Sequence, residues 1–186
     1  DKFPSALVSN EFVIETYDID NIIKFKYIHN HLNTHFIKNY NYNLEYIKWS
    51  MSKILTHNLS LLDKHNNIIG TISVKPTQLI INNKLLNTGY VDYLAIHNKY
   101  RNKRLAPILI SNIIEKNKFK TYIFKIETRK LPFDYICKYR YYVYDLTNKI
   151  FNTKNNLKIL DVYDIELAYD FYNSKMINYK LYQKYT

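Results

Sequence analysis

The sequence predicts an α+β domain, with a mixed sheet of mostly antiparallel strands covered by helices. Three observations predict this fold class. Apolar residues recur at helical spacing from Ile22 to Ile54, and β-branched stretches with short polar turns follow from Leu59 to Ile96. A strand then leads directly into an amphipathic helix that begins near Arg104. No repeat or linker divides the 186 residues, so we expect a single domain.

The first elements are a short strand and two helices. Phe12–Glu15 is predicted to be extended, and Asp18–Asn21 offers a helix start with Asp20 as the N-cap. A second short helix is predicted over Leu44–Ile54, with Trp49 in the core. His29, His31 and His35 could share one face of the first helix, and we expect that face to be solvated.

The central strands are separated by turns rich in asparagine. The predicted strands are Leu59–Asp63, Ile68–Val74 with its continuation Gln78–Ile81, and Leu85–Ile96. The predicted turns between them are His65–Asn67 and Asn82–Asn83.

The C-terminal half alternates helices, strands and loops. Its predicted elements are a helix over Arg104–Lys116, a strand over Thr121–Glu127, a helix over Pro132–Leu146, a polar loop over Asn148–Asn156, and two terminal strands over Leu157–Tyr163 and Asn178–Gln183. The order of elements is that of an α+β or mixed-sheet α/β domain.

The composition excludes several classes of protein. The one cysteine, Cys137, rules out an intrachain disulfide framework and a cysteine-based zinc site, and we expect it to be a buried small residue. The histidines show no paired metal-ligand spacing, so no metal is expected. No apolar run approaches the roughly 20 residues that span a bilayer, and the first residues lack a signal-peptide pattern. We therefore expect an intracellular, cytoplasmic protein.

The net charge of +11 results from 27 Lys and Arg against 16 Asp and Glu. Asn, Ile, Lys and the 20 Tyr residues have AT-rich codons, so a biased genome, as in insect poxviruses, giant viruses and some protists, explains most of this composition. The charge is therefore weak evidence for nucleic-acid binding, although a basic surface attracts phosphate groups of any kind.

The segment from Val91 to Pro107 carries the chemistry. A strand ends, a short basic loop follows, and an amphipathic helix begins. Free backbone N–H groups and the helix dipole favour an anion at such a helix start, and Arg101, Lys103 and Arg104 add positive charge. The pattern indicates a phosphate-binding loop; a solvated basic turn is the alternative.

The residues from Asp92 to Pro107 resemble the acyl-CoA-binding segment of eukaryotic glycylpeptide N-myristoyltransferases, N-F-L-C-V-H-K-K-L-R-S-K-R-L-A-P. The specific part is Arg-x-Lys-Arg-Leu-Ala-Pro at 101–107, this family's form of the pyrophosphate loop of the GNAT acyltransferase superfamily. The resemblance implies a single GNAT-like domain over residues 1–186, equivalent to the family's first half, with the second half absent.

Shorter matches follow in the family's order from residue 12 to residue 183. They are Phe12 to Asp18, Tyr40 to Trp49, Gly70 to Pro76 (G-F-I-S-A-x-P), Thr128 with Leu131-Pro132, Arg140 to Tyr142, Lys158 to Val162, and Lys180 to Tyr182.

The resemblance also implies site residues. The CoA phosphates would bind Arg101, Asn102, Lys103, Arg104, Leu105, Ala106 and Pro107. Backbone N–H groups of Tyr93 and Leu94 would form the oxyanion hole, which needs a bulge or splay in the sheet. Thr128 would help to hold the acceptor amine, and Tyr40, Tyr42 and Tyr141 would contact the substrate.

Asp92 replaces an asparagine of the family. The family's base is its own C-terminal carboxylate, so we expect Asp92 to act as the general base or as the partner of the ammonium. Ordinary hydrogen bonding at a strand end is the alternative, and the carboxylate of Thr186 is a weaker candidate. His97 matches the family and is expected to have a local structural role.

The sequence thus predicts an N-myristoyltransferase-like acyltransferase. It would move the acyl group of myristoyl-CoA or another long-chain acyl-CoA to an amine, with the N-terminal glycine of a protein as the expected acceptor. A non-catalytic acyl-CoA or lipid-binding module, or a partner-binding protein with the same fold, is the main alternative. Acyl-chain length, acceptor and oligomeric state stay open, and a homodimer would restore the two-half layout.

Overall fold

The computed structural model describes residues 11–36, 41–52, 56–124 and 161–184. The chain divides into two compact units, one formed by residues 1–125 with 180–186, and the other by residues 126–179. Each unit is described by itself.

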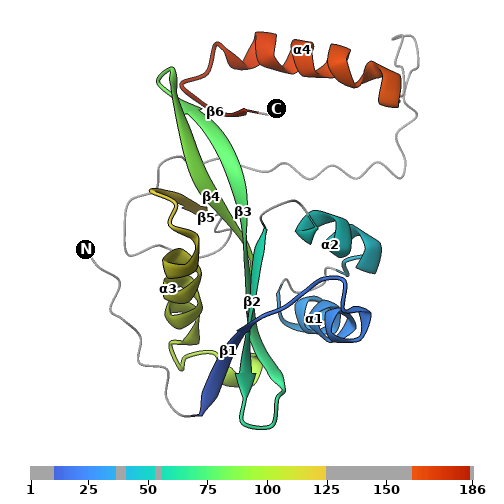
Figure 1. Cartoon of the computed structure of the whole chain (residues 1–186), viewed down its shortest axis with the longest axis vertical. Helices are drawn as coiled ribbons and strands as arrows, with labels where there is room; N and C mark the ends of the chain where they lie inside the picture. The colour runs from blue at the N-terminus through green and yellow to red at the C-terminus, as the bar shows by residue number, and fades with distance from the viewer. Residues whose placement is uncertain (1–10, 37–40, 53–55, 125–160, 185–186) are drawn as a thin grey trace, which may run out of the picture. The chain divides into compact units, whose positions relative to one another are not determined.

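The first unit is built on one mixed sheet (Figure 1). Its strands are β1 (Phe12–Thr16), β2 (His57–Asp63), β3 (Ile68–Ile81), β4 (Lys84–Ile96), β5 (Tyr122–Phe124) and β6 (Leu181–Lys184). The order is β1-β2-β3-β4-β5, and β6 pairs with the far half of β3, from Gln78 to Ile81. All pairs are antiparallel except β4–β5, which is parallel. The predicted mixed-sheet fold class is confirmed.

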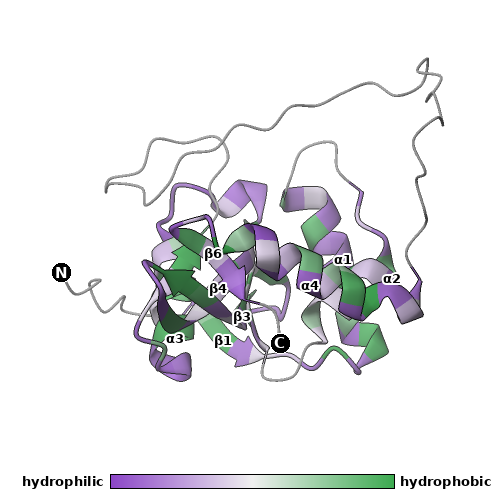
Figure 2. Ribbon diagram, turned by 90° about the horizontal axis from the view of Figure 1, so that it is seen from above, coloured by the Kyte–Doolittle hydropathy of each residue, from purple (hydrophilic) through white to green (hydrophobic). Residues whose placement is uncertain are grey.

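Three helices cover the two faces of this sheet. Helices α1 (Ile22–His35) and α2 (Leu44–Met51) lie on one face, and α3 (Leu105–Asn117) lies on the other (Figure 1). A short 3-10 helix, η1 (Asn98–Tyr100), connects β4 to α3. Figure 2 shows apolar residues gathered on the strands between the helical layers.

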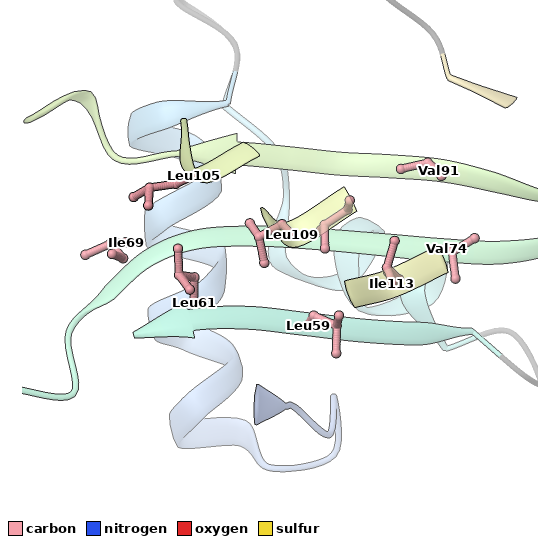
Figure 3. Close-up of a cluster of buried hydrophobic side chains, with 9 residues drawn as sticks. Leu59, Leu61, Ile69, Val74, Val91, Leu105, Leu109 and Ile113 are labelled. Carbon is pink, nitrogen blue, oxygen red and sulfur yellow. The ribbon is translucent and has the colours of Figure 1, made fainter. Parts of the chain in front are cut away.

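The face under α3 holds the larger core. Its buried residues are drawn in Figure 3 and are Leu59, Leu61, Ile69, Ile72, Val74, Val91, Leu105, Leu109 and Ile113. Leu109 and Ile113 are fully buried because they lie four residues apart on the face of α3 that meets the sheet. This core fixes the start of α3 against the end of β4.

The opposite face has a second core, between the sheet and the α1–α2 layer. Its buried residues are Tyr17, Phe25, Ile28, Leu32, Ile47, Met51, Tyr93 and Ala95. Trp49 is 62% exposed and the prediction that it belongs to the core is wrong, because α2 buries the face that carries Ile47, Ser50 and Met51.

Helix starts and turns follow asparagine chemistry. The α1 N-cap is Asn21, whose side chain accepts from the N–H of Lys24, and not Asp20, whose own N–H bonds to Asp18 in the preceding turn. Asn82 and Asn83 both have positive φ, at 47° and 64°, as expected for a two-residue hairpin turn. The β3–β4 hairpin therefore forms where the sequence places it.

The ends of several predicted elements differ by a few residues. Helix α2 ends at Met51 because the N–H and hydroxyl of Ser52 both turn back to the carbonyl of Trp49. The strand predicted from Thr121 is described from Tyr122 to Phe124. The predicted helix over Pro132–Leu146, the loop over Asn148–Asn156 and Cys137 lie outside the described residues.

The second unit contains a 3-10 helix, η2 (Val162–Asp164), and α4 (Ile165–Met176). A strand predicted to reach Tyr163 is wrong at that end, because the side chains of Asp161 and Asp164 form a reciprocal capping box that starts a helix. Helix α4 was not predicted from the sequence, and several of its large apolar residues are exposed.

Candidate functional site

Strand β4 has a bulge at the residues expected to face a reacting carbonyl. Ser73 pairs with Asp92 and Thr71 pairs with Ala95, so Tyr93 and Leu94 together oppose a single residue of β3. Tyr93 has a φ of 52°, which is rare for a bulky side chain. The buried hydroxyl of Thr71 donates to the Tyr93 carbonyl at 3.0 Å and so stabilises the bulge.

The bulge changes which face each side chain takes. Val91 and Leu94 pack with the α3 core, whereas Tyr93 and Ala95 belong to the α1–α2 core. Asp92 contacts groups on the α1–α2 side as well. Two consecutive side chains, Asp92 and Tyr93, therefore point to the same face, which a regular strand does not allow.

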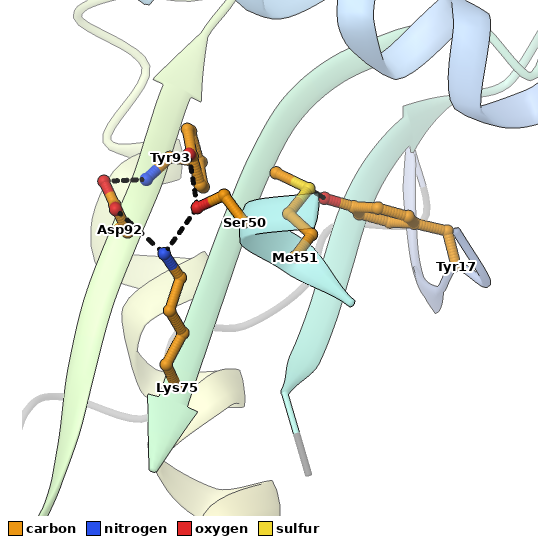
Figure 4. Close-up of polar contacts among 6 residues, drawn as sticks. All are labelled: Tyr17, Ser50, Met51, Lys75, Asp92 and Tyr93. Carbon is orange, nitrogen blue, oxygen red and sulfur yellow. Dashed lines mark hydrogen bonds and ion pairs between the residues drawn. The ribbon is translucent and has the colours of Figure 1, made fainter. Parts of the chain in front are cut away.

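These two residues form a polar cluster with Lys75 and Ser50 (Figure 4). The Tyr93 hydroxyl lies 2.9 Å from Ser50 Oγ, and Lys75 Nζ donates to the same oxygen at 2.8 Å. Lys75 Nζ also lies 3.5 Å from Asp92 Oδ2. The N–H of Tyr93 donates to Asp92 Oδ1 at 2.9 Å. Strands β3 and β4 and helix α2 thus bring an ammonium, a carboxylate and two hydroxyls together.

The cluster is largely shielded from water. The side chains of Lys75 and Asp92 are 15% and 27% exposed, and Lys75 Nζ lies 5.2 Å from the centroid of the Tyr93 ring. Burial raises the pKa of the Tyr93 phenol, so this group stays a neutral hydroxyl. The predicted substrate contact Tyr42 packs its ring edge-on against Tyr93, at 6.2 Å between centroids.

The positions of Asp92 and Tyr93 are coupled. The Tyr93 N–H, expected as an oxyanion donor, is bonded to the carboxylate expected as the base. One donor group and one acceptor group of the predicted chemistry therefore satisfy each other in the structure as it stands. Leu94 supplies the other amide at the bulge.

The basic loop lies at the end of β4, before α3. Asn102 and Arg104 have φ values of 72° and 56°, and Arg104 caps α3 without a side-chain hydrogen bond. The first N–H groups of α3 therefore have no side-chain cap, which is the arrangement that anions bind. Pro107 is tolerated here because first-turn N–H groups have no partner within the helix.

The side chains of this loop differ in their contacts. Arg101, Asn102, Lys103 and Arg104 are exposed, Ala106 is half-buried, and Leu105 is buried in the core. Arg101 donates through its guanidinium to the carbonyls of Ile96, at 3.2 Å, and His35, at 2.6 Å, so it ties the loop to β4 and α1. Lys103 Nζ lies 5.2 Å from the centroid of the Tyr100 ring.

A row of histidine rings lies beside the loop. His31 and His35 are 4.9 Å apart, and His35 and His97 are 4.2 Å apart, between ring centroids. Burial, followed by the neighbouring His35, lowers the pKa of His31 to about 4. The prediction of a solvated histidine face is wrong, because α1 packs this face on β4, where His31 lies 3.4 Å from the Ala95 carbonyl.

His97 has the expected local role. Its Nδ1 accepts from the N–H of Lys99 and so caps η1. The remaining predicted site residues lie outside the described residues, namely Tyr40, Thr128, Tyr141 and Thr186.

Three residues of the site, Lys75, Ser50 and Thr71, were not predicted from the sequence. Lys75 had a visible signal, since it is a lone lysine within a long apolar strand, between Val74 and Pro76. A charged residue there calls for a partner of opposite charge on a neighbouring strand. Ser50 and Thr71 carry no such signal, because serine and threonine are common in helices and strands.

No group of three or more His, Cys, Asp or Glu residues in the described ranges is placed to hold a metal ion. None of the described helices is both long and apolar enough to cross a membrane.

Comparison with known sequences gives consistent matches. The family profile described as the N-terminal domain of myristoyl-CoA:protein N-myristoyltransferase matches residues 2–130. The chain is 27% identical over 103 residues to the glycylpeptide N-tetradecanoyltransferase of Plasmodium falciparum, covering 53% of this chain and 24% of that protein. It is 31% identical over 138 residues to a putative glycylpeptide N-tetradecanoyltransferase of Amsacta moorei entomopoxvirus, covering 70% and 44%. The matches thus span less than half of these relatives.

Solved structures share the fold. Saccharomyces cerevisiae N-myristoyltransferase with bound myristoyl-CoA and inhibitors aligns with a TM-score of 0.69 and 18% identity, over 100% of this chain and 51% of that one. A second structure of the yeast enzyme, with bound myristoyl-CoA, aligns with a TM-score of 0.56 and 22% identity, over 60% and 29%.

Proposed function

This chain belongs to the N-myristoyltransferase family, through the N-terminal domain of that family, and from this premise we propose that it transfers a long-chain acyl group from CoA to an amine. Myristoyl is the expected acyl group and the N-terminal glycine of a protein the expected acceptor. The bulge in β4 carries the proposal, because it brings two backbone amides, of Tyr93 and Leu94, next to a carboxylate near the end of the strand that leads into the basic loop.

The CoA phosphates would bind at the start of α3. The uncapped N–H groups after Arg104 and the exposed side chains of Lys103 and Arg104 support this assignment. Arg101 would hold the loop in shape and add charge, since its guanidinium already bridges β4 and α1. The backbone of the loop and of the first turn of α3 would be shaped by Asn102, which has a positive φ, and by Leu105, Ala106 and Pro107.

The acyl carbonyl would lie at the bulge. The Leu94 amide, joined by that of Tyr93 once the Asp92 carboxylate turns toward the amine, would stabilise the oxyanion. Asp92 would take the proton from the attacking amine, and the CoA thiol would leave. No metal is needed for these steps. The acceptor would contact Thr128, Tyr40, Tyr42 and Tyr141.

One reaction followed by mass tests the proposal. The purified chain is incubated with myristoyl-CoA and peptides that begin with a free glycine, and we expect a peptide product heavier by one acyl chain. The same peptides with an acetylated N-terminus are the substrate control. The double variant Lys103→Ala/Arg104→Ala is expected to weaken acyl-CoA binding, whereas the exposed pair Lys64→Ala/Lys116→Ala leaves it unchanged.

A non-catalytic acyl-CoA-binding module is the second candidate. The bond between the Tyr93 amide and Asp92 favours it, because this bond occupies both a predicted donor and the predicted base. Stoichiometric binding of myristoyl-CoA with no acylated peptide would support this candidate. Failure to bind any acyl-CoA would contradict both.

A further inference from the structure

We propose that Lys75 is itself an acyl acceptor, and that a bound long-chain acyl thioester modifies its Nζ to give a stable Nε-acyl-lysine. The inference rests on the proposed function, because it uses the same thioester position. It goes further, because it assigns a covalent modification site to a residue within this chain.

The amine of Lys75 lies among the groups that acyl transfer requires. Its Nζ is 3.5 Å from Asp92 Oδ2, and Asp92 is oriented by the N–H of Tyr93 at 2.9 Å. A nucleophile within reach of a base that is itself oriented by a third group is the usual arrangement of an activated nucleophile. The Leu94 amide, which would polarise the carbonyl, belongs to the bulge two residues after Asp92.

Ser50 keeps this amine in place. Its Oγ accepts from Lys75 Nζ at 2.8 Å and lies 2.9 Å from the Tyr93 hydroxyl. The amine is thereby held on the side of β4 that carries the Asp92 and Tyr93 side chains, with only 15% of the lysine side chain exposed. An amine fixed beside the reaction centre has a large advantage over one that must diffuse to it.

The chain contains a matched lysine elsewhere. The side chain of Lys24 is also half-buried, with 30% of it exposed, and it forms an ion pair with Glu15. This pair joins α1 to β1, and β1 lies three strands away from β4 in the sheet order. A carboxylate partner alone would make the two lysines equivalent, so a difference in acylation reports the position beside the bulge.

The reaction balances without any further reagent. Asp92 takes one proton from the Lys75 ammonium, and the neutral amine attacks the thioester carbonyl carbon. The C–N bond forms, the C–S bond breaks, and the CoA thiolate leaves with the second amine proton as the free thiol. The products are an amide, CoA and one proton released from Asp92 to water.

The modification would change the site permanently. An amide is stable in water near neutral pH, so each chain would react once. Acylation removes the positive charge that now lies beside Asp92. The modified chain would therefore present the Asp92 carboxylate without its cation, and acceptor peptides would compete with Lys75 for the acyl group.

The test uses the whole chain with myristoyl-CoA and no peptide. Intact mass and peptide mapping are expected to show one added acyl chain, located on Lys75, with a rate that saturates as acyl-CoA increases. Acylation of Lys24 in the same digest is expected to be at least about tenfold slower, since it measures the uncatalysed reaction. Lys75→Arg should abolish the product, Lys24→Arg should leave it, and Asp92→Asn should slow it by about 100-fold or more.

Two results would overturn the inference. The first would leave the proposed function standing, and the second would contradict it as well. Acylation of Lys75 no faster than that of Lys24, in a chain that acylates glycine peptides, would leave the proposed function standing and reduce Lys75 to the ion-pair partner of Asp92. A chain that binds no myristoyl-CoA would lose the inference and the proposed function together.

Discussion

Tyr93 adopts a backbone conformation that costs energy and that its surroundings hold in place. A bulky residue at positive φ costs of the order of 1–3 kcal/mol. Thr71 bonds its carbonyl, Ser50 contacts its hydroxyl, and Asp92 accepts from its N–H, so every polar group of the residue has a partner. The bulge is therefore a fixed feature, and these contacts hold the groups beside it in place.

The substitution Asp92→Asn is expected to lower the rate of acyl transfer about 100-fold to 10,000-fold, because the side-chain amide of asparagine cannot take a proton. The asparagine can still accept from the Tyr93 N–H, so folding and acyl-CoA binding should change little. Single-turnover transfer to a glycine peptide is the measurement. The control is Asp20→Asn, which removes an exposed carboxylate that pairs with Lys48. Full activity of Asp92→Asn would eliminate Asp92 as the base.

His31 makes stability depend on pH. Its folded pKa of about 4 lies below the ordinary value of 6.5, so the unfolded chain binds more protons between these values. The contribution of His31 to the free energy of unfolding is therefore fully present above about pH 6.5, and it is lost as the pH drops toward 4. The loss at pH 5, relative to pH 7.5, is expected to be about 2 kcal/mol.

Urea unfolding at the two pH values measures this loss. The variant His31→Leu should lose much of the pH dependence, while the exposed turn residue His65, changed to Gln, should keep it. An unchanged pH dependence in His31→Leu would assign the effect to other groups.

The sequence located the residues of the bulge and the loop, but not what each one contacts. The Arg-x-Lys-Arg-Leu-Ala-Pro segment is specific enough to locate the start of α3. The partner of Asp92 was missed because Lys75 lies seventeen positions earlier, and only the register of β3 and β4 brings them together. Burial of the histidines was missed because it depends on how α1 packs.

Among the elements, β5 depends on a close approach at Gly89. A Cβ at this position would lie 2.8 Å from atoms of Tyr122 and Val74, and 2.9 Å from Phe119. These neighbours come from β5, β3 and the segment after α3, so the glycine allows three parts of the core to meet at β4. The parallel β4–β5 pair begins at this residue.

Gly89→Ala is expected to destabilise the fold by about 1–3 kcal/mol, because the ring of Tyr122 cannot move away without displacing β5. Chemical denaturation measures the change. Lys84→Ala, an exposed substitution on the same strand, should change stability by less than about 0.5 kcal/mol. A neutral Gly89→Ala would mean that β5 is held less closely than the structure indicates.

Elements with strong local signals were predicted well. The two asparagines at 82 and 83 fix the β3–β4 hairpin, and alternation of apolar residues identifies the strands on each side. Helix α4 was missed because it continues from η2, which a capping box between two aspartates starts, and because several of its large apolar residues are exposed. Strand boundaries near β5 depend on pairing with β4, which local sequence does not encode.

For the whole molecule, the charge of +11 predicts weak and purely electrostatic contact with nucleic acids. Such binding releases counterions and falls steeply with salt. Affinity for a short RNA is expected to fall at least about tenfold between 50 and 200 mM salt. Fluorescence anisotropy checks this, and affinity that persists at high salt would instead indicate a dedicated nucleic-acid site. Myristoyl-CoA binding should fall less, since burial of the acyl chain does not depend on charge.

Strand β6 has a consequence for synthesis. Its first residue, Leu181, pairs with Ile81, so this contact spans about a hundred residues of chain. A ribosome that adds roughly 5–20 residues per second needs about 5–20 s to make that stretch. During this interval the edge of β3 from Gln78 to Ile81 has no β6 to cover it, and exposed strand edges attract other chains. The nascent protein is therefore most vulnerable to misassociation after strands β1 to β5 are already made, and a chaperone that shields this edge would raise the yield of folded chains.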